Sequence, residues 1–345
     1  MKVLVTGVDG YIGCLLGPYL RGRGHEVVGL DTGYYRDGWL FNDTALVPQT
    51  PPTLNKDIRQ IEAVDLAGFD AVCHLAELSN DPLCENTPEL TFEINHQGSV
   101  RLAEMAKAAG VKRFVYTSSC SVYGIGNGDA PVDERSPTHP QTAYAECKML
   151  VERDVSALAD AHFSPTFLRN ATAYGASPRM RFDIVLNNLC GLAATTGKIV
   201  MTSDGSPWRP LVHVLDICEA VACTLEAPQT AIHNQVFNVG HDEDNYQVRE
   251  IAQIVAEVYP GCELSFGPPG GDNRSYRVSF AKIHQQLPGF HCNWDARKGA
   301  QQLHDVFARI GLDAATFNAR PFTRLKRLKN LSATGQIGDK FYWQH

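Results

Sequence analysis

The sequence lacks the features that would assign it to a membrane, to nucleic acid or to a metal. No apolar run in its 345 residues reaches the roughly 18 residues that suggest a membrane-spanning helix. The formal net charge is −7, so the chain has no general attraction for nucleic-acid phosphate. None of the ten scattered cysteines forms a Cys-x-x-Cys pair. In a chain this long, such cysteines are typically reduced core residues, so we expect neither a disulfide framework nor a metal site.

Internal repeats and low-complexity tracts are also missing, and we expect no leader segment. The chain begins directly with the strand-like residues 2–5, which leaves no room for a signal peptide. We therefore expect a cytoplasmic protein with no membrane or nucleic-acid partner.

What the sequence does contain is a repeated strand-and-helix pattern. Short runs that are apolar on both faces are typical of strands buried in a parallel sheet; they occupy residues 3–5, 27–30, 71–75, 114–116 and 166–168. Helix-length segments separate them, notably 12–22, 93–110 and 142–161. Strand, helix and strand in repetition predict an α/β fold with a Rossmann-type, doubly wound parallel sheet.

Three glycines follow the first strand and open the first helix. Gly7 permits a tight turn, Gly10 lets the backbone approach a pyrophosphate, and Gly13 lets the helix pack closely on the strand. The helix dipole then favours phosphate at this end. Asp31 ends the second strand, where a carboxylate can bind both adenosine ribose hydroxyls and repel a 2′-phosphate. The pattern predicts NAD, with Arg36 keeping a small NADP option open.

The order of these segments also predicts two domains. A late strand at 235–240 looks like one more core strand of the sheet. We therefore predict an NAD-binding Rossmann domain of residues 1–170 plus 213–240. Residues 171–212 plus 241–345 would form a smaller α/β substrate-binding domain. Within the latter, the basic and amphipathic segment 323–329 is interpreted as a solvated helix face.

Tyr144 and Lys148 are candidates for acid–base chemistry. They lie four residues apart, on one face of a predicted helix. An unperturbed tyrosine has a pKa of about 10, too high for a base at neutral pH. A nearby lysine and a positive nicotinamide would favour the phenolate and lower that pKa. The serine-rich strand end at 116–124 can supply a hydroxyl, Ser119, to the same substrate oxygen.

Together these motifs resemble the extended short-chain dehydrogenase/reductase family, the nucleotide-sugar epimerases and dehydratases, over nearly the whole chain. The resemblance implies that Tyr144 takes a proton from a sugar hydroxyl, that Ser119 holds this hydroxyl, and that Lys148 binds the nicotinamide ribose and tunes Tyr144. The cofactor contacts that it implies are Gly7, Gly10, Tyr11, Ile12, Gly13, Asp31, Asp57, Ile58, Leu75, Ala76, Asn95, Tyr144 and Lys148.

The same resemblance implies a nucleoside diphosphate sugar as substrate. Arg209 and Arg274 fall where family arginines clamp the diphosphate, and a guanidinium fork suits phosphate oxygens. The other implied substrate contacts are Ser79, Ser119, Cys120, Ser121, Thr172 and Asn188. The polar stretch 77–81 either hydrogen-bonds sugar hydroxyls or is simply a hydrophilic loop. Many relatives dimerise through helices at 93–110 and 142–161, which implies a homodimer.

Departures from the family pattern discriminate among its activities. Cys120 and Ser121 stand where 4,6-dehydratases carry an Asp-Glu pair, which disfavours water elimination. The cysteine of 3,5-epimerases lies one position later, so Cys120 is interpreted as a packing residue. We therefore predict NAD-dependent epimerisation at C4 through a 4-keto intermediate. The alternatives are a nucleotide-sugar C4 dehydrogenase or ketoreductase, then a 3,5-epimerase or 4,6-dehydratase, and last a non-catalytic NAD-sensing protein.

Overall fold

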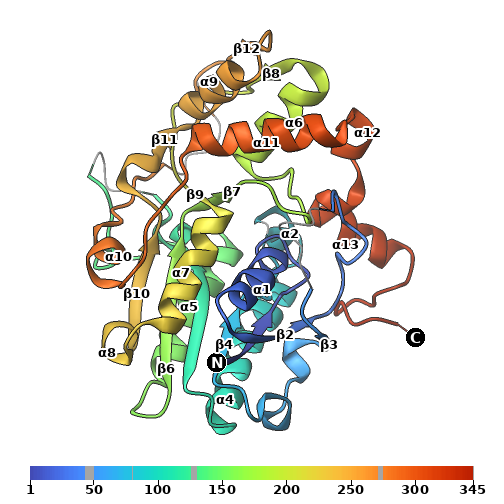
Figure 1. The fold of residues 1–345 in the computed structure, drawn as a ribbon. Helices are drawn as coiled ribbons and strands as arrows, with labels where there is room; N and C mark the ends of the chain where they lie inside the picture. Colours follow the sequence, from blue (N-terminus) through green and yellow to red (C-terminus); the bar gives the residue numbers. More distant parts are fainter. Residues whose placement is uncertain (43–49, 80, 126–129, 271–274, 345) are drawn as a thin grey trace.

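The computed structural model describes residues 1–42, 50–79, 81–125, 130–270 and 275–344 (Figure 1). Its main sheet has seven strands in the order β10-β6-β5-β4-β1-β2-β3, and each neighbouring pair is parallel. The strands are β1 (Lys2–Thr6), β2 (Glu26–Asp31), β3 (Thr53–Asn55), β4 (Ala71–His74), β5 (Arg113–Ser119), β6 (Ser164–Asn170) and β10 (Gln235–Val239). The strand order reverses between β1 and β4, so the predicted doubly wound Rossmann-type fold is confirmed.

Helices cover both faces of this sheet. On one face α1 (Gly13–Gly22) packs on α7 (Val214–Glu226), and on the other α4 (Ser99–Ala108) packs on α5 (Ala143–Ser156). Alternate residues of β1 feed the two cores: Val3 and Val5 join the first, and Leu4 joins the second. A strand that is buried on both faces must be apolar at every position, which explains the continuous runs in the sequence.

The chain between β4 and α4 is more broken than the sequence suggested. The predicted helix 93–110 consists of a π-helical turn, Phe92–Gly98, that continues into α4. Two short helices precede it, α2 (Asp81–Asn86) and α3 (Pro88–Thr91). After β4 the chain thus forms a loop at the carboxyl edge of the sheet, and it then passes through these short helices into α4.

A smaller set of elements lies above the carboxyl ends of the main strands (Figure 1). It holds a three-stranded sheet of β7 (Thr172–Tyr174), β9 (Trp208–His213) and β11 (Asn245–Gln247), and a pair of β8 (Lys198–Val200) and β12 (Glu263–Ser265). The helices α6 (Val185–Thr196), α9 (Val248–Val258) and α11 (Ala296–Ile310) pack on one another. The short helix α12 (Ala314–Phe317) packs on α6 in this set, whereas α8 (Gln229–Ile232) and α10 (Ala281–Gln286) pack on β6 and β10 of the main sheet.

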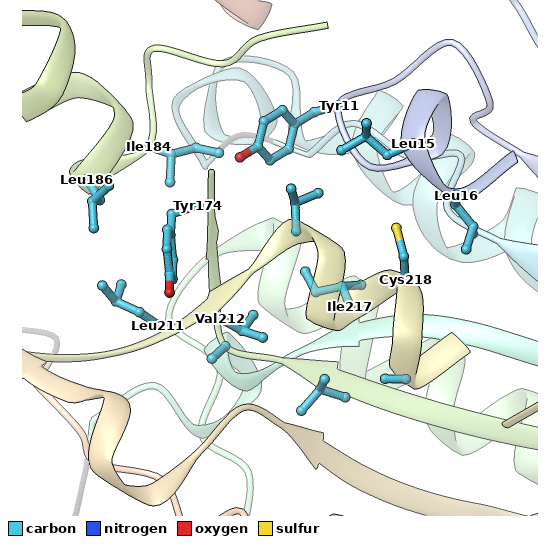
Figure 2. Packing of buried hydrophobic residues seen from close by; sticks show 14 of the residues in the cluster. Tyr11, Leu15, Leu16, Tyr174, Ile184, Leu186, Leu211, Val212, Ile217 and Cys218 are labelled. Carbon is cyan, nitrogen blue, oxygen red and sulfur yellow. The ribbon is translucent and has the colours of Figure 1, made fainter. Parts of the chain in front are cut away.

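Tyr11 links the glycine-rich turn to this smaller set. Its hydroxyl donates to the carbonyl of Gly175 at 2.7 Å and accepts from the side-chain amide of Asn187 at 3.1 Å. Figure 2 shows Tyr11 and Leu15 in the same buried cluster as Tyr174, Ile184 and further apolar side chains. The turn is therefore fixed to both parts of the structure.

The end of the chain returns to the main sheet. In α13 (Arg324–Ala333), the side chain of Arg327 donates to the carbonyl of Tyr34 at 2.9 Å. Trp343 packs on Tyr34, and its indole NH donates to the carbonyl of Thr32 at 2.6 Å. We predicted that these residues belong to the substrate-binding domain, and the division into two domains stays a prediction. In the structure this C-terminal segment contacts the residues that follow β2 of the main sheet.

The interpretation of segment 323–329 as a solvated face is wrong for part of it. Arg324 is 3% exposed and Leu328 is 1% exposed, whereas Lys326 and Lys329 point to solvent. The charge pattern alone does not show this, because the buried Arg324 is held by a residue far away in the sequence: its guanidinium lies 4.1 Å from the centre of the Tyr35 ring. In the part of the chain that the structure describes, no helix is long and apolar enough to cross a bilayer.

A buried ion pair joins α5 to two central strands and gives a stability prediction. Glu152 binds Arg169 of β6 at 2.7 Å and accepts from the hydroxyl of Ser118 of β5. Glu152→Ala leaves a buried guanidinium unpaired, so we expect the free energy of unfolding to fall by about 3–5 kcal/mol. The exposed neighbour Arg153→Ala is the control and should change it by less than about 1 kcal/mol. Urea denaturation measures both; equal effects would contradict the prediction.

Candidate active site at the carboxyl ends of the strands

A cavity of about 930 Å³ lies at the carboxyl edge of the main sheet. Its walls come from the turns that directly follow β1, β2, β4, β5 and β6, and from residues of β7, α5, β9 and α13. Parallel strands bring these turns to one edge, and the reversal of strand order between β1 and β4 opens a crevice there. The cavity is large enough for a dinucleotide and a second ligand to share.

The glycine-rich turn has no space for side chains. A Cβ at Gly13 would lie 2.1 Å from the carbonyl oxygen of Gly7, so α1 can approach β1 this closely only with glycine there. Gly7 has a φ of +73°, and a Cβ on it would meet the amide of Ala76 at 2.9 Å. The structure thus builds a backbone cradle of the kind that a pyrophosphate needs, at the start of a helix.

Asp31 stands at the end of β2 with its carboxylate in the cavity wall. It accepts the amides of Gly33 at 2.7 Å and of Asp9 at 3.1 Å. Burial and then the neighbouring Asp9 carboxylate raise the pKa of Asp31 to about 6. Arg36 pairs with Asp9 at 2.9 Å and is not among the residues that line the cavity, which favours NAD over NADP.

The neighbouring wall suits an adenine. Asp57 and Ile58 line it together with Tyr34. The Asp57 carboxylate is held by Arg59 at 2.7 Å, which fixes the position of this turn. Leu75 and Ala76 complete the wall, and both of their amides donate to the hydroxyl of Thr6 at 3.2 Å.

The three predicted catalytic residues lie in the same cavity. Ser119 ends β5, and its hydroxyl oxygen accepts the amide of Ser121 at 3.1 Å, so its proton remains available to donate. Thr142 caps the N-terminus of α5, which carries Tyr144 and Lys148. The Lys148 ammonium lies 5.4 Å from the centre of the Tyr144 ring. The structure thus brings the residues together, and their roles remain predictions.

The electrostatics of Tyr144 differ from expectation. Burial, followed by the carboxylates of Glu77 and Asp81, raises the pKa of Tyr144 above its ordinary value. The lowering of this pKa by Lys148 together with a bound nicotinamide stays a prediction. In the structure the Lys148 nitrogen lies 2.7 Å from a carboxylate oxygen of Glu77, so Glu77 compensates the charge of Lys148.

Three predicted contact residues are not among those that line the cavity. The side-chain amide of Asn95 is fully buried, accepting from and donating to the backbone of Leu78 at 2.8 Å each. The Cys120 thiol is buried and donates to the carbonyl of Arg169 at 3.1 Å. The Asn188 amide donates to the carbonyl of Phe182 at 2.9 Å. Their assignment as contact residues stays a prediction, and the buried Cys120 thiol agrees with the interpretation of Cys120 as a packing residue.

The other predicted substrate residues divide into two groups. Ser79, Ser121, Thr172 and Arg209 line the cavity. The buried hydroxyl of Ser121 has no hydrogen-bond partner within the described ranges, so its hydrogen-bonding capacity is unused there. Arg274 lies outside the described residues.

Sequence reasoning missed two arginines in the cavity wall. Arg181 forms a two-point ion pair with Asp183, each contact 3.0 Å, and donates to the Ser79 hydroxyl at 3.3 Å. Arg324 of α13 is almost completely buried, with its guanidinium 4.1 Å from the centre of the Tyr35 ring. Neither segment has a sequence motif that predicts a place in the cavity wall. Both arginines reach the cavity through the tertiary fold.

The model of the NAD dependent epimerase/dehydratase family matches residues 3–240. The chain belongs to this family. NAD is therefore its cofactor, and the residues present fit it, because the glycine cradle and Asp31 would hold its diphosphate and adenosine ribose.

The UDP-glucose 4-epimerase of Mycolicibacterium smegmatis is 32% identical over 308 residues, covering 83% of this chain and 92% of that protein. The UDP-glucose 4-epimerase of Corynebacterium glutamicum is 28% identical, covering 83% and 90%. Among solved structures, MoeE5 in complex with UDP-glucuronic acid and NAD is 28% identical, with a TM-score of 0.76 and coverage of 90% and 100%. This family member therefore shares sequence and fold with nucleotide-sugar enzymes.

Gly13→Ala tests the cradle. The added Cβ would displace α1 from the turn, so we expect at least about tenfold weaker NAD binding, equivalent to about 1.4 kcal/mol. Gly22→Ala at the far end of the same helix meets no atom within 4 Å and is the matched control. Titration calorimetry on nucleotide-free protein measures both affinities; unchanged binding by the Gly13 variant would exclude a close backbone contact.

The raised pKa of Asp31 gives a pH prediction. An ionised carboxylate accepts both ribose hydroxyls, whereas its protonated form loses an acceptor. We therefore expect NAD affinity to be highest above pH 6 and to fall as the pH drops through about 6. Asp31→Asn should bind more weakly and lose this pH dependence. A wild-type affinity that is constant between pH 5 and 8 would argue against Asp31 as the ribose ligand.

Proposed function

We propose that this protein catalyses NAD-dependent epimerisation at C4 of a nucleotide-linked sugar, through a 4-keto intermediate. The observation that carries the proposal is one cavity lined by the NAD cradle, by Asp31 and by Ser119, Tyr144 and Lys148. The similar UDP-glucose 4-epimerases support the same reaction type. The positions after Ser119 hold a buried thiol and a hydroxyl, so the acid–base pair of a 4,6-dehydratase is missing from that turn.

Tyr144 would act as the base. Its phenolate, which the positive charge of a bound nicotinamide would favour, removes the proton of the sugar C4 hydroxyl. The O–H of Ser119 donates to the same oxygen and fixes it. When bound, NAD supplies the hydride acceptor and later the donor. On return, the Tyr144 phenol gives its proton back to the C4 oxygen. If the keto sugar rotates within the cavity before the hydride returns to C4, the opposite face of C4 receives it and the product is the C4 epimer.

The nucleotide part of the substrate would lie toward the smaller set of elements. Arg209 of β9 lines the cavity, and a guanidinium can bind a diphosphate through two parallel hydrogen bonds. The unpartnered hydroxyl of Ser121 and the hydroxyl of Thr172 are available for the sugar. The alternative, net oxidation or reduction at C4, uses the same residues and differs in whether the keto sugar leaves.

We also propose a homodimer through α4 and α5. Ala103, Ala106 and Ala145 are already buried within one chain, whereas Met105, Met149 and Leu150 are partly exposed. Contacts between copies would therefore use the latter three.

Tyr144→Phe tests the base. Loss of the phenolic oxygen should lower kcat by at least about 100-fold, the smaller end of what acid–base catalysis contributes. NAD should stay bound, because Asp31 and the cradle are untouched. Tyr246→Phe removes the same atom outside the cavity and should retain wild-type turnover. Normal turnover by the Tyr144 variant would show that another group is the base.

The reaction itself is tested with UDP-, GDP-, CDP- and dTDP-hexoses in heavy water, followed by NMR. Interconversion of C4 epimers without solvent deuterium is the expected result. Deuterium at C3 or C5 would indicate a 3,5-epimerase, and a keto sugar with stoichiometric NADH would indicate a dehydrogenase. No change in any sugar would overturn the proposed function.

A further inference from the structure

We propose that Glu77 is a positioning residue that fixes the ammonium of Lys148, compensates its charge, and thereby controls how readily Tyr144 releases its proton. The proposal rests on the function proposed above, since it assigns a task within the same cavity. Glu77 lies three residues beyond the end of β4 and belongs to the polar stretch 77–81, for which the sequence left two interpretations open.

Glu77 and Lys148 form a buried ion pair, which we call the clamp. One carboxylate oxygen lies 2.7 Å from the Lys148 nitrogen, and the two side chains are only 2% and 4% exposed. The other oxygen accepts the hydroxyl of Tyr116 at 2.5 Å, with the hydroxyl of Ser99 at 3.5 Å. Lys148 also donates to the carbonyl of Thr117 and lies 4.5 Å from the centre of the Tyr116 ring. A lysine side chain has several rotatable bonds, and these contacts fix its end.

Among the described residues around Glu77, Lys148 carries the positive charge that balances the Glu77 carboxylate. His74 lies behind the clamp, joined to Ser99 at 2.7 Å and to Thr6 at 2.7 Å. Burial, and then the charge of Lys148, lower the pKa of His74 to about 3, so His74 is neutral at ordinary pH. Within the described residues, the groups that contact or act on Glu77 are Lys148 and Tyr144 from α5, Tyr116 from β5 and Ser99 from α4, and His74 of β4 is bonded to Ser99.

The clamp acts on Tyr144 through charge. After burial, the Glu77 carboxylate is the largest influence that raises the pKa of Tyr144. Asp81 and Cys84 act in the same direction, and Arg181 opposes them. A phenolate forming beside a compensated Lys148 gains less attraction than it would beside a free ammonium. Glu77 therefore makes Tyr144 a weaker acid, and its phenolate a stronger base.

A purely structural ion pair would have different consequences. Removing one partner would then lower stability and leave the acidity of Tyr144 unchanged. Glu152, whose carboxylate pairs with Arg169 rather than with Lys148, provides that comparison within the same fold. Its side chain is 8% exposed, so Glu152→Gln is the same chemical change at a comparably buried site.

The experiment compares Glu77→Gln with wild type in NAD-loaded protein. Tyrosinate absorbance is followed against pH and corrected with the matching Tyr144→Phe proteins, so that the ionisation of Tyr144 is isolated without any substrate. We expect ionisation in the Glu77 variant at a pH lower by about one unit, a tenfold change in acidity. Glu152→Gln should ionise as wild type does. Ionisation of Glu77→Gln at the wild-type pH or higher, or in neither protein by pH 11, would overturn the proposal.

Turnover separates this proposal from the proposed function. With a sugar that wild type converts, the acid limb of the kcat profile should move to lower pH in Glu77→Gln, with KM within about twofold of wild type because sugar contacts are untouched. Wild type that converts no sugar would overturn the proposed function, while the tyrosinate titration would still decide the task of Glu77.

Glu77→Asp is a second variant in case Glu77→Gln fails to fold. It keeps the charge but shortens the side chain, so it cannot reach both Lys148 and Tyr116. We expect Tyr144 to ionise within about 0.3 pH units of wild type, because the charge that acts on it is retained. A shift to lower pH as large as that expected for Glu77→Gln would show that charge is not what Glu77 contributes.

Discussion

All seven strands of the main sheet run in one direction, and this constraint decides where the protein can do chemistry. Parallel strands need crossover helices on both faces, so neither face is open to a ligand. The chain must then turn at the carboxyl edge after every strand. The glycine cradle and the loop that carries Glu77 are two such turns, and Asp31 and Ser119 end the strands that lead into two others. Their proximity follows from the topology.

Much of this could be predicted because it depends on local sequence. Strands buried on both faces leave continuous apolar runs, and glycines that a close backbone contact requires cannot be replaced. A tyrosine and a lysine four residues apart share a helix face wherever that helix lies. The parallel sheet, the NAD cradle, and the place of Tyr144 and Lys148 in the cavity were accessible from the sequence for these reasons.

What could not be predicted depends on pairing between distant residues. The sequence shows Lys148, but it does not show that the Glu77 carboxylate pairs with it, or that burial and then Glu77 raise the pKa of Tyr144. Asn95 and Cys120 stand at family positions, yet backbone groups of Leu78 and Arg169 occupy their polar atoms. Arg324 lies 176 residues after Lys148 (324 − 148), the last of the predicted cofactor residues. Side-chain partners of this kind are fixed by tertiary packing, on which spacing along the sequence carries no information.

The composition of the cavity wall also bears on how the protein is made. Residues 3–240 contain the seven strands and the proposed catalytic residues, but Val248, Tyr276 and Arg324 complete the wall. On the ribosome, the nucleotide-binding sheet can therefore assemble long before its pocket is closed. A nascent chain that has reached β10 contains all seven strands of the main sheet but not the whole wall of the cavity. Completion of the pocket is in this sense a late event of synthesis, whereas all the predicted cofactor residues have been made once Lys148 has been added.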